Sequence, residues 1–387
     1  MYDRLSAPRL LQAARTYPVV AVLGPRQSGK TTLVQATFPE KRYVSLEDPD
    51  TQDYATTDPR RFLKDLEAGA VLDEVQRAPD LLRYIQGIVD ARKEPGLFVL
   101  TGSRNLNLLE GISQSLAGRV SLHTLLPLAL EELKTARALP ASLEAVLFTG
   151  FYPRIHDRKL DPSDWLGNYV QTYVERDVRQ VRNVGDFASF SRFLRSCAAR
   201  SGHILNLSSL GNDCGITHNT ARAWLSVLEA TYIAFIVQPY YENFEKRLRR
   251  SPKLYFHDTG LLCYLLGIRR PEDISFHASR GPVFETFAMS EILKAKLNRG
   301  LPRDLWFWQD KLGNEIDCVF DVSRRRIAVE LKSGETIASD FFKNISYWRR
   351  LTGAPREDCF LVHAGADRQE RSEATVLPWR EIDALPL

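Results

Sequence analysis

Long hydrophobic runs are missing from this sequence of 387 residues, and no apolar stretch approaches the roughly 20 residues that a membrane-spanning helix needs. The N-terminal stretch MYDRLSAPRLL lacks the charged-then-apolar pattern of a signal peptide, so we expect a cytoplasmic protein. A large surplus of charge is also absent. With a net charge of only +4, nucleic-acid binding would have to come from local basic patches.

Metal-ligand and disulfide patterns are missing as well. The five cysteines are far apart and odd in number, which excludes a disulfide framework and gives no zinc motif, and we expect buried free thiols. The seven histidines show no paired metal-ligand spacing. The apolar content of 44% and charged content of 26% are those of an ordinary globular protein, and the length predicts two or three domains.

What is present is a phosphate-binding pattern between residues 19 and 32. An apolar run predicts a buried strand up to Leu23, and a helical pattern starts at Thr31. Gly24 and Gly29 let the backbone curl around a triphosphate, Lys30 offers a charge to its β and γ phosphates, and the Thr31 hydroxyl can ligate Mg²⁺. The predicted ATP-binding residues are Gly24, Pro25, Arg26, Gln27, Ser28, Gly29, Lys30, Thr31 and Thr32.

Three further positions have the chemistry that such a site needs. A short apolar run ends in Asp73 and Glu74, which predicts that Asp73 holds Mg²⁺ and Glu74 activates the attacking water; the alternative is that both merely end a strand. Ser103, or Asn105 beside it, ends another buried strand and could sense the γ-phosphate, or could be a turn residue. Strands that alternate with helices predict a parallel sheet covered on both faces.

The motifs resemble those of a known family. GPRQSGKTT, YVSLEDPD, AVLDEVQRAPDLL, LFVLTGSRN, SLAGRV and TYVERDVRQV are similar to the prokaryotic AAA-type (AAA_14) ATPases with a C-terminal DUF4143 domain. This resemblance implies an ATPase core in which Lys30, Thr31, Asp73 and Glu74 have the roles described above. It makes Arg119 the first arginine to test as a finger on a neighbouring subunit's nucleotide, although a solvated surface role is the simpler alternative.

A helix-turn-helix is predicted from residue 207 to 229. The strand-like stretch from Tyr232 to Val237, the basic run after it and the stretch from Lys253 to Phe256 resemble a β wing. Its outward face and basic loop could neutralise DNA phosphates, but winged helices also contact proteins. The residues predicted to bind DNA are His218, Asn219, Arg222, Lys246, Arg247, Arg249 and Arg250.

The C-terminal segment predicts a helix, three strands, a second helix and a last strand at Cys359 to His363. Glu330 and Lys332 point the same way on one strand, and Asp317 on the preceding strand can join Glu330 around a divalent cation. This segment resembles the PD-(D/E)xK nuclease fold, in which Glu285 stands where a helix acid is often found. A structural ion-pair cluster, or a DNA-binding platform that does not cut, remains an alternative.

Together these patterns predict an α/β protein with four parts. The expected boundaries are a P-loop ATPase core at 1–126, a helical lid at 127–182, a winged helix at 183–273 and a nuclease-like domain at 274–387. We expect ATP and Mg²⁺ as cofactors, and a homo-oligomer, such as a hexameric ring, that binds or remodels DNA, branched DNA being one candidate. The alternatives are an ATP-stimulated metal-dependent nuclease and an ATP-regulated switch that binds proteins.

Overall fold

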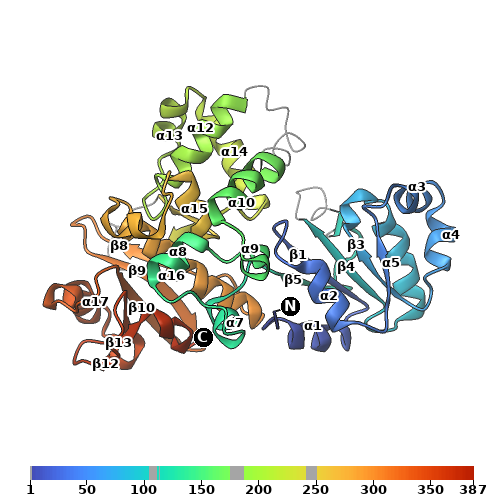
Figure 1. Ribbon diagram of the computed structural model, residues 1–387. Helices are drawn as coiled ribbons and strands as arrows, with labels where there is room; N and C mark the ends of the chain where they lie inside the picture. The colour runs from blue at the N-terminus through green and yellow to red at the C-terminus, as the bar shows by residue number, and fades with distance from the viewer. Residues whose placement is uncertain (1, 104–110, 113, 175–186, 241–250) are drawn as a thin grey trace. The chain divides into compact units, whose positions relative to one another are not determined.

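The chain forms two compact units in a computed structural model (Figure 1). The first comprises residues 1–128, 230–232 and 297–301, and the second comprises the rest. All five cysteines are buried free thiols, as predicted. In the described part of the chain, no helix is long and apolar enough to cross a membrane. The structure describes residues 2–103, 111–112, 114–174, 187–240 and 251–387.

The first unit is built on a five-stranded sheet in the order β2-β3-β4-β1-β5, and every neighbouring pair is parallel. Its elements in chain order are α1 (Ala7–Ala14), β1 (Val19–Gly24), α2 (Lys30–Thr37), β2 (Arg42–Ser45), α3 (Pro49–Thr57), α4 (Pro59–Lys64), β3 (Ala70–Asp73), η1 (Val75–Arg77), α5 (Leu81–Arg92), β4 (Phe98–Ser103) and β5 (Val120–Thr124).

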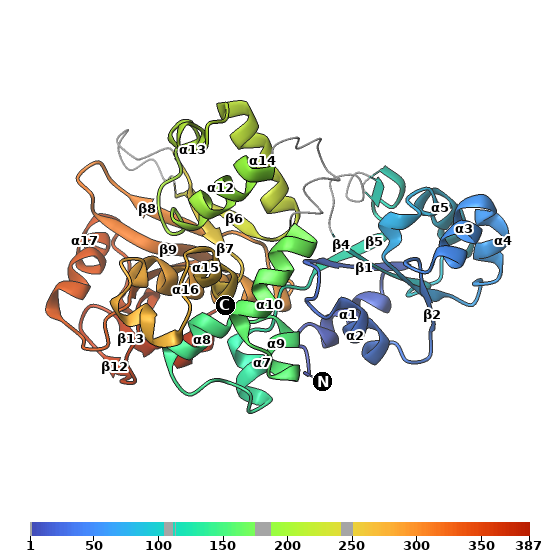
Figure 2. The same ribbon diagram turned by 45° about the horizontal axis from the view of Figure 1, so that its top comes forward.

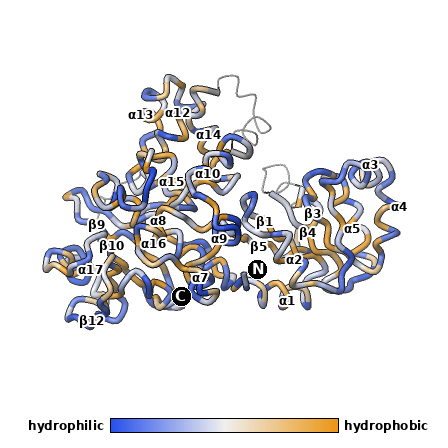
Figure 3. The backbone as a smooth tube through the Cα atoms, in the orientation of Figure 1, coloured by the Kyte–Doolittle hydropathy of each residue, from blue (hydrophilic) through white to orange (hydrophobic). Residues whose placement is uncertain are grey.

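Alternating side chains of β1 enter two separate hydrophobic clusters. Val20 and Val22 pack in the cluster formed with α1 and α2, whereas Ala21 and Leu23 pack in the cluster formed with α4 and α5. Figure 2 shows the sheet between these two sets of helices, and in Figure 3 hydrophobic colour gathers along β3, β4 and α5. Because both faces are covered, the strand is apolar throughout. The predicted parallel sheet with helices on both faces is confirmed.

The fifth strand, β5, is absent from the sequence prediction. It lies at an edge of the sheet and pairs with β1 along its whole length. Its side chains are mostly half-buried, and Leu122 is 52% exposed. Apolar and polar residues alternate only over the four residues from Val120 to His123, the shortest alternation that indicates a half-buried strand, and this pattern was overlooked.

The second unit contains helices followed by a mixed eight-stranded sheet. Its elements are α7 (Leu130–Thr135), α8 (Leu143–Thr149), α9 (Pro153–Arg158), α10 (Pro162–Tyr169), η2 (Val170–Val174), α12 (Phe187–Ala198), α13 (Leu207–Cys214), α14 (His218–Ala230), β6 (Ala234–Pro239), β7 (Lys253–Phe256), α15 (Thr259–Leu265), η3 (Pro271–Phe276), α16 (Arg280–Asn298), β8 (Trp306–Gln309), β9 (Glu315–Val322), β10 (Arg325–Lys332), η4 (Ser339–Phe342), α17 (Lys343–Thr352), η5 (Arg356–Asp358), β11 (Cys359–His363), β12 (Gln369–Glu370), β13 (Thr375–Pro378) and η6 (Trp379–Ala384).

The large sheet has the strand order β12-β13-β11-β10-β9-β8-β6-β7. Strands β8, β9 and β10 form an antiparallel meander, and β11 returns parallel to β10 after α17. The predicted order of helix, three strands, helix and strand is therefore present. The prediction that β11 is the last strand is wrong, because β13 pairs with β11 and β12 with β13. Strand β6 pairs with β8, so one sheet runs across the boundary expected after residue 273.

Candidate functional site

The phosphate-binding pattern lies in the turn between β1 and α2. Gly29 and Gln27 both adopt positive φ, 91° and 62°, as the chain reverses before α2. Gly24 is required for a different reason, since a Cβ there would lie 2.1 Å from the carbonyl oxygen of Leu125. The tight turn leaves the N-terminus of α2 at the carboxyl edge of the sheet, where free backbone N–H groups favour an anion.

Lys30 and Thr31 lie at the first turn of α2. Lys30 is buried, and its Nζ donates to the carbonyl oxygens of Gly24, at 3.2 Å, and Pro25, at 2.8 Å. The Thr31 hydroxyl donates to Asp73 Oδ2 at 3.0 Å. The structure therefore brings together the two sequence segments predicted to hold a nucleotide and its metal, although 42 positions separate Thr31 from Asp73.

Asp73 ends β3 and accepts hydrogen bonds from hydroxyl groups of neighbouring elements. Tyr43 of β2 donates to Oδ2 at 2.7 Å, and Thr101 of β4 donates to Oδ1. Burial, together with the hydrogen bond to Asp73, raises the pKa of the Tyr43 phenol, so it remains a donor at neutral pH. Sequence analysis missed Tyr43 and Thr101; the signal was their place near the ends of strands parallel to β3.

Glu74 follows Asp73 in a left-handed conformation, with φ of 57°, which is uncommon for this residue type. Its Oε2 accepts a hydrogen bond from Gln76 Nε2, and the same nitrogen donates to Ser103 Oγ at 3.0 Å. Gln76, which sequence analysis missed, therefore links the predicted water-activating carboxylate to the predicted γ-phosphate sensor.

Replacement of Gln76 by alanine is expected to lower kcat for ATP about tenfold and to leave KM within about twofold, because Glu74 loses the donor that orients it. Steady-state phosphate release measures both constants. Gln76→Glu is a second variant for the same test. It keeps the size of the side chain but offers a carboxylate in place of the N–H donor, so we expect the same loss of kcat. An unchanged kcat in Gln76→Ala would show that Glu74 needs no such positioning.

Arg4 is a buried residue near the N-terminus that also braces the phosphate loop. Its Nη1 donates to the carbonyl oxygen of Ser28 and its Nη2 to that of Leu126, both at 2.7 Å. Nothing in the sequence pattern marked Arg4, because its partners are backbone atoms of distant segments. It ties the loop after β1 to the segment after β5.

Arg119 precedes β5 at the amino end of the sheet, next to Val19. The length of β1 puts it roughly 17 Å from Gly24 along the strand direction. Its guanidinium is paired with Asp90 of α5, with Nη2 donating to Oδ2 at 2.9 Å. It therefore lies away from the phosphate loop of its own subunit, and a role on a neighbouring subunit stays a prediction.

The predicted helix-turn-helix consists of α13 and α14. Gly215 adopts φ of 69° after α13, and the Thr217 hydroxyl accepts from the backbone N–H of Thr220 at 3.1 Å to cap α14. On α14, Asn219 and Arg222 are exposed and His218 is half-buried. Strands β6 and β7 form an antiparallel hairpin after it. The basic residues predicted between these strands lie outside the described residues: Lys246, Arg247, Arg249 and Arg250.

The nuclease-like site predicted from the sequence is only partly assembled as expected. Lys332 Nζ donates to Glu330 Oε1 at 2.7 Å, and Asn344 Nδ2 donates to the same oxygen at 3.0 Å. Asp317 Oδ2 accepts from the backbone N–H of Leu331 at 2.7 Å. Burial, followed by the Glu330 charge, raises the pKa of Asp317 well above its usual range, and burial raises that of Glu330.

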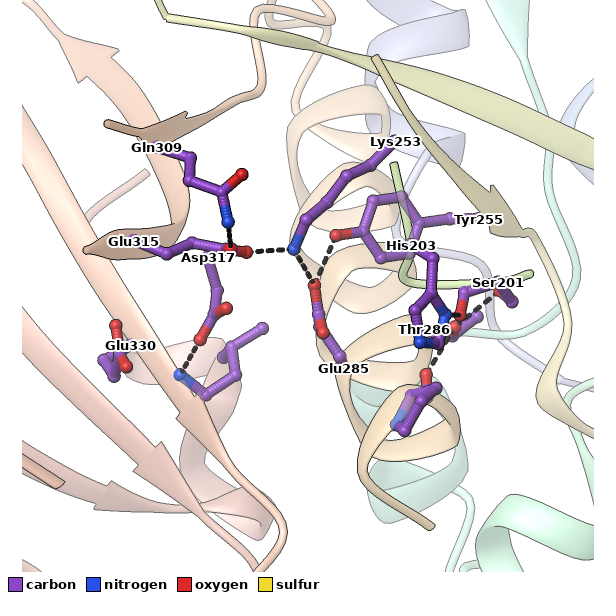
Figure 4. Close-up of polar contacts among 12 residues, drawn as sticks. Ser201, His203, Lys253, Tyr255, Glu285, Thr286, Gln309, Glu315, Asp317 and Glu330 are labelled. Atoms are coloured by element: carbon purple, nitrogen blue, oxygen red, sulfur yellow. Dashed lines mark hydrogen bonds and ion pairs between the residues drawn. The ribbon is translucent and has the colours of Figure 1, made fainter. Parts of the chain in front are cut away.

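Glu285 of α16 lies close to Asp317 and Glu315. Sequence analysis identified Glu285 and Asp317 but missed Glu315. One carboxylate oxygen from each of these three residues, which we call the acidic trio, lies within 4.8 Å of the others. Lys253 of β7 donates to Glu285 at 2.9 Å and also to Glu315 (Figure 4). Burial alone would lower the pKa of Lys253, but the charges of Glu285 and Glu315 outweigh it and the pKa is raised.

Comparisons with known proteins agree with the domain order. Residues 16–134 match the family described as AAA domain, and residues 280–382 match the domain of unknown function DUF4143. An uncharacterized protein of Mycobacterium tuberculosis is 32% identical over 336 residues, covering 86% of this chain and 74% of that protein. The chain belongs to the AAA-type ATPases that carry a DUF4143 domain. Residues 140–272 of this chain match a further domain of unknown function, DUF8612.

A second relative and two solved structures are also similar to this chain. An uncharacterized protein of Mycobacterium bovis matches it to the same extent as the Mycobacterium tuberculosis protein does. A Walker-type ATPase of Pyrococcus abyssi is 18% identical, covers 68% of this chain and 96% of its own, and gives a TM-score of 0.47. AMPPCP-bound DnaA from Aquifex aeolicus is 16% identical, covers 58% and 86%, and gives 0.31.

Proposed function

We propose that this AAA-type ATPase hydrolyses ATP with Mg²⁺ and uses the cycle to bind or remodel DNA through its helix-turn-helix. The observation that carries the ATPase proposal is the convergence of Lys30, Thr31 and Asp73 at one edge of a parallel sheet, with Glu74 beside them. Lys30 would contact the β and γ phosphates, and Glu74 would accept the proton of the attacking water.

The residues around Asp73 fit a magnesium ion. The Thr31 hydroxyl and the Asp73 carboxylate offer oxygen atoms, the ligands that Mg²⁺ prefers. When bound, the ion would neutralise charge on the phosphates. Tyr43 and Thr101 would hold the carboxylate in place through their hydrogen bonds.

The DNA part of the proposal rests on α14. Its apolar side is buried through Ala221, Trp224 and Leu228, which leaves Asn219 and Arg222 exposed on the other side. The Trp224 ring packs edge-on against Phe193 of α12, at 5.4 Å between centroids, so the helix is held firmly. An exposed polar helix face on a rigid helix-turn-helix suits the major groove. We propose a homo-oligomer, such as a ring, as the working form.

ATP hydrolysis should increase several-fold in the presence of duplex, single-stranded or four-way-junction DNA, because we propose that DNA binding is coupled to the ATP cycle. The measurement is phosphate release at moderate salt, with Lys30→Ala as the blank. Arg222→Ala should require several-fold more DNA for half-maximal stimulation and keep basal turnover, since it removes about one phosphate contact. Arg158→Ala, at an exposed arginine on α9, is the matched control.

The outcome also separates this proposal from its rival. Intact basal turnover without stimulation by any DNA would instead favour an ATP-regulated switch that binds a protein through α14. Stimulation that Arg222→Ala leaves unchanged would keep the DNA-coupled ATPase but exclude α14 as its contact.

A further inference from the structure

The acidic trio contains two residues of the predicted nuclease-like site, Glu285 and Asp317. Glu285 comes from α16, whereas Glu315 and Asp317 come from β9, and their carboxylate oxygens converge within 4.8 Å. Half-buried carboxyl groups at this separation repel one another whenever more than one is ionised, so a positive partner stabilises the cluster. Oxygen ligands in this number would suit Mg²⁺ or Mn²⁺.

The protein itself supplies a positive partner. Lys253 belongs to β7, which is far from the trio in sequence, and its side chain is only 5% exposed. Figure 4 shows its ammonium between Glu285 on one side and Glu315 on the other, and it forms ion pairs with both. The strand that carries it is fixed by antiparallel pairing with β6, so Lys253 is directed into the cluster by the fold.

Other groups donate hydrogen bonds to these carboxylates. The Tyr255 hydroxyl donates to the same Glu285 oxygen as Lys253, and Gln309 Nε2 donates to the second oxygen of Glu315. Asp317 accepts from the Leu331 backbone. A divalent cation would have to displace a buried ammonium and compete with these donors, and a buried charge that loses its partners is strongly unfavourable.

We propose that the Lys253 ammonium is the resident cation of the acidic trio and that this chain binds no divalent cation there. The trio therefore does not fit a divalent cation, although the order of helices and strands matches the one predicted for a PD-(D/E)xK nuclease. At this point β7 supplies the positive charge that a metal ion would otherwise supply. The proposal is independent of the ATPase and DNA-binding proposals.

Counting of bound Mn²⁺ by electron paramagnetic resonance, on the full chain without nucleotide, tests the proposal. Wild type and Asp317→Asn should bind equally, because wild type holds no ion at the trio. Lys253→Met should gain one Mn²⁺ per chain, because the three carboxyl groups lose the ammonium that lies between them. Adding Glu315→Gln to Lys253→Met should remove the gain.

A matched control separates the trio from the general loss of a buried lysine. Lys296 has a 3% exposed side chain and pairs with a single carboxylate, that of Asp304, so Lys296→Met should gain no ion. Wild-type Mn²⁺ binding that Asp317→Asn removes would overturn the proposal. A Lys253→Met variant that folds but binds no additional Mn²⁺ would overturn the proposal too. If Lys253→Met does not fold, the wild-type comparison with Asp317→Asn decides alone.

Discussion

Replacement of Lys30 by alanine should abolish measurable ATP turnover, with a loss of roughly a hundred- to a thousandfold in kcat/KM. Lys30 is buried at the start of α2, where the carbonyl oxygens of Gly24 and Pro25 accept from its ammonium at the predicted position of the phosphates. Alanine removes this positive charge. Phosphate release and equilibrium binding of a fluorescent ATP analogue measure both consequences, since binding should weaken as well.

The control for this variant is Lys64→Ala, at an exposed lysine in α4 of the same unit. It should keep wild-type turnover, and both variants should keep the far-ultraviolet circular dichroism spectrum of the wild type. Turnover by a folded Lys30→Ala protein at the wild-type rate would refute the assignment of this turn as the ATP site.

The phosphate-binding turn of the first unit could be predicted from the sequence because its sequence pattern is local. A buried strand, two glycines and a helix start stand next to one another between Val19 and Thr37, so no long-range contact is needed to recognise them. Asp73 could be predicted for the same reason, as it ends a continuous apolar run. The edge strand β5 was overlooked, because its apolar and polar residues alternate over only four positions.

The hydrogen-bond partners of the site were beyond prediction for a different reason. Tyr43 and Thr101 contact Asp73 from strands on either side of β3, and Gln76 reaches Ser103 across 27 positions. Each residue type is common on any strand or turn, so its role becomes visible only once the strand order is known. The sequence therefore predicts the residues that would touch nucleotide better than those that orient them.

The nuclease-like site illustrates the limit most clearly. Asp317, Glu330 and Lys332 were identified from alternation along two strands, and their positions on β9 and β10 agree with it. Lys253 was assigned only to a wing strand, because nothing local shows that β6 joins β8 and carries β7 to the acidic trio. A single lysine from a distant segment changes what the cluster can bind.

Replacement of Glu74 by glutamine should stop hydrolysis and leave ATP binding nearly intact. The amide has the size of the carboxylate and can still accept from Gln76, but it cannot take a proton from water. We expect kcat to fall roughly a hundred- to a thousandfold and the affinity for ATP to stay within about threefold. Phosphate release and binding of the fluorescent analogue, measured together, distinguish this result from that of Lys30→Ala, in which both quantities fall.

The matched control is Glu67→Gln, at an exposed glutamate of the same unit, which should behave as wild type. Retained hydrolysis in Glu74→Gln would assign proton transfer to another group, whereas loss of binding would mean that Glu74 supports the nucleotide pocket and not the chemical step. The left-handed backbone of Glu74 favours a role in proton transfer, because a residue held in a costly conformation beside Asp73, the carboxylate proposed to hold Mg²⁺, is typical of a positioned catalytic group. A protein that binds ATP without turning it over would also trap the nucleotide-bound form, in which DNA affinity at α14 can be compared directly with the nucleotide-free form.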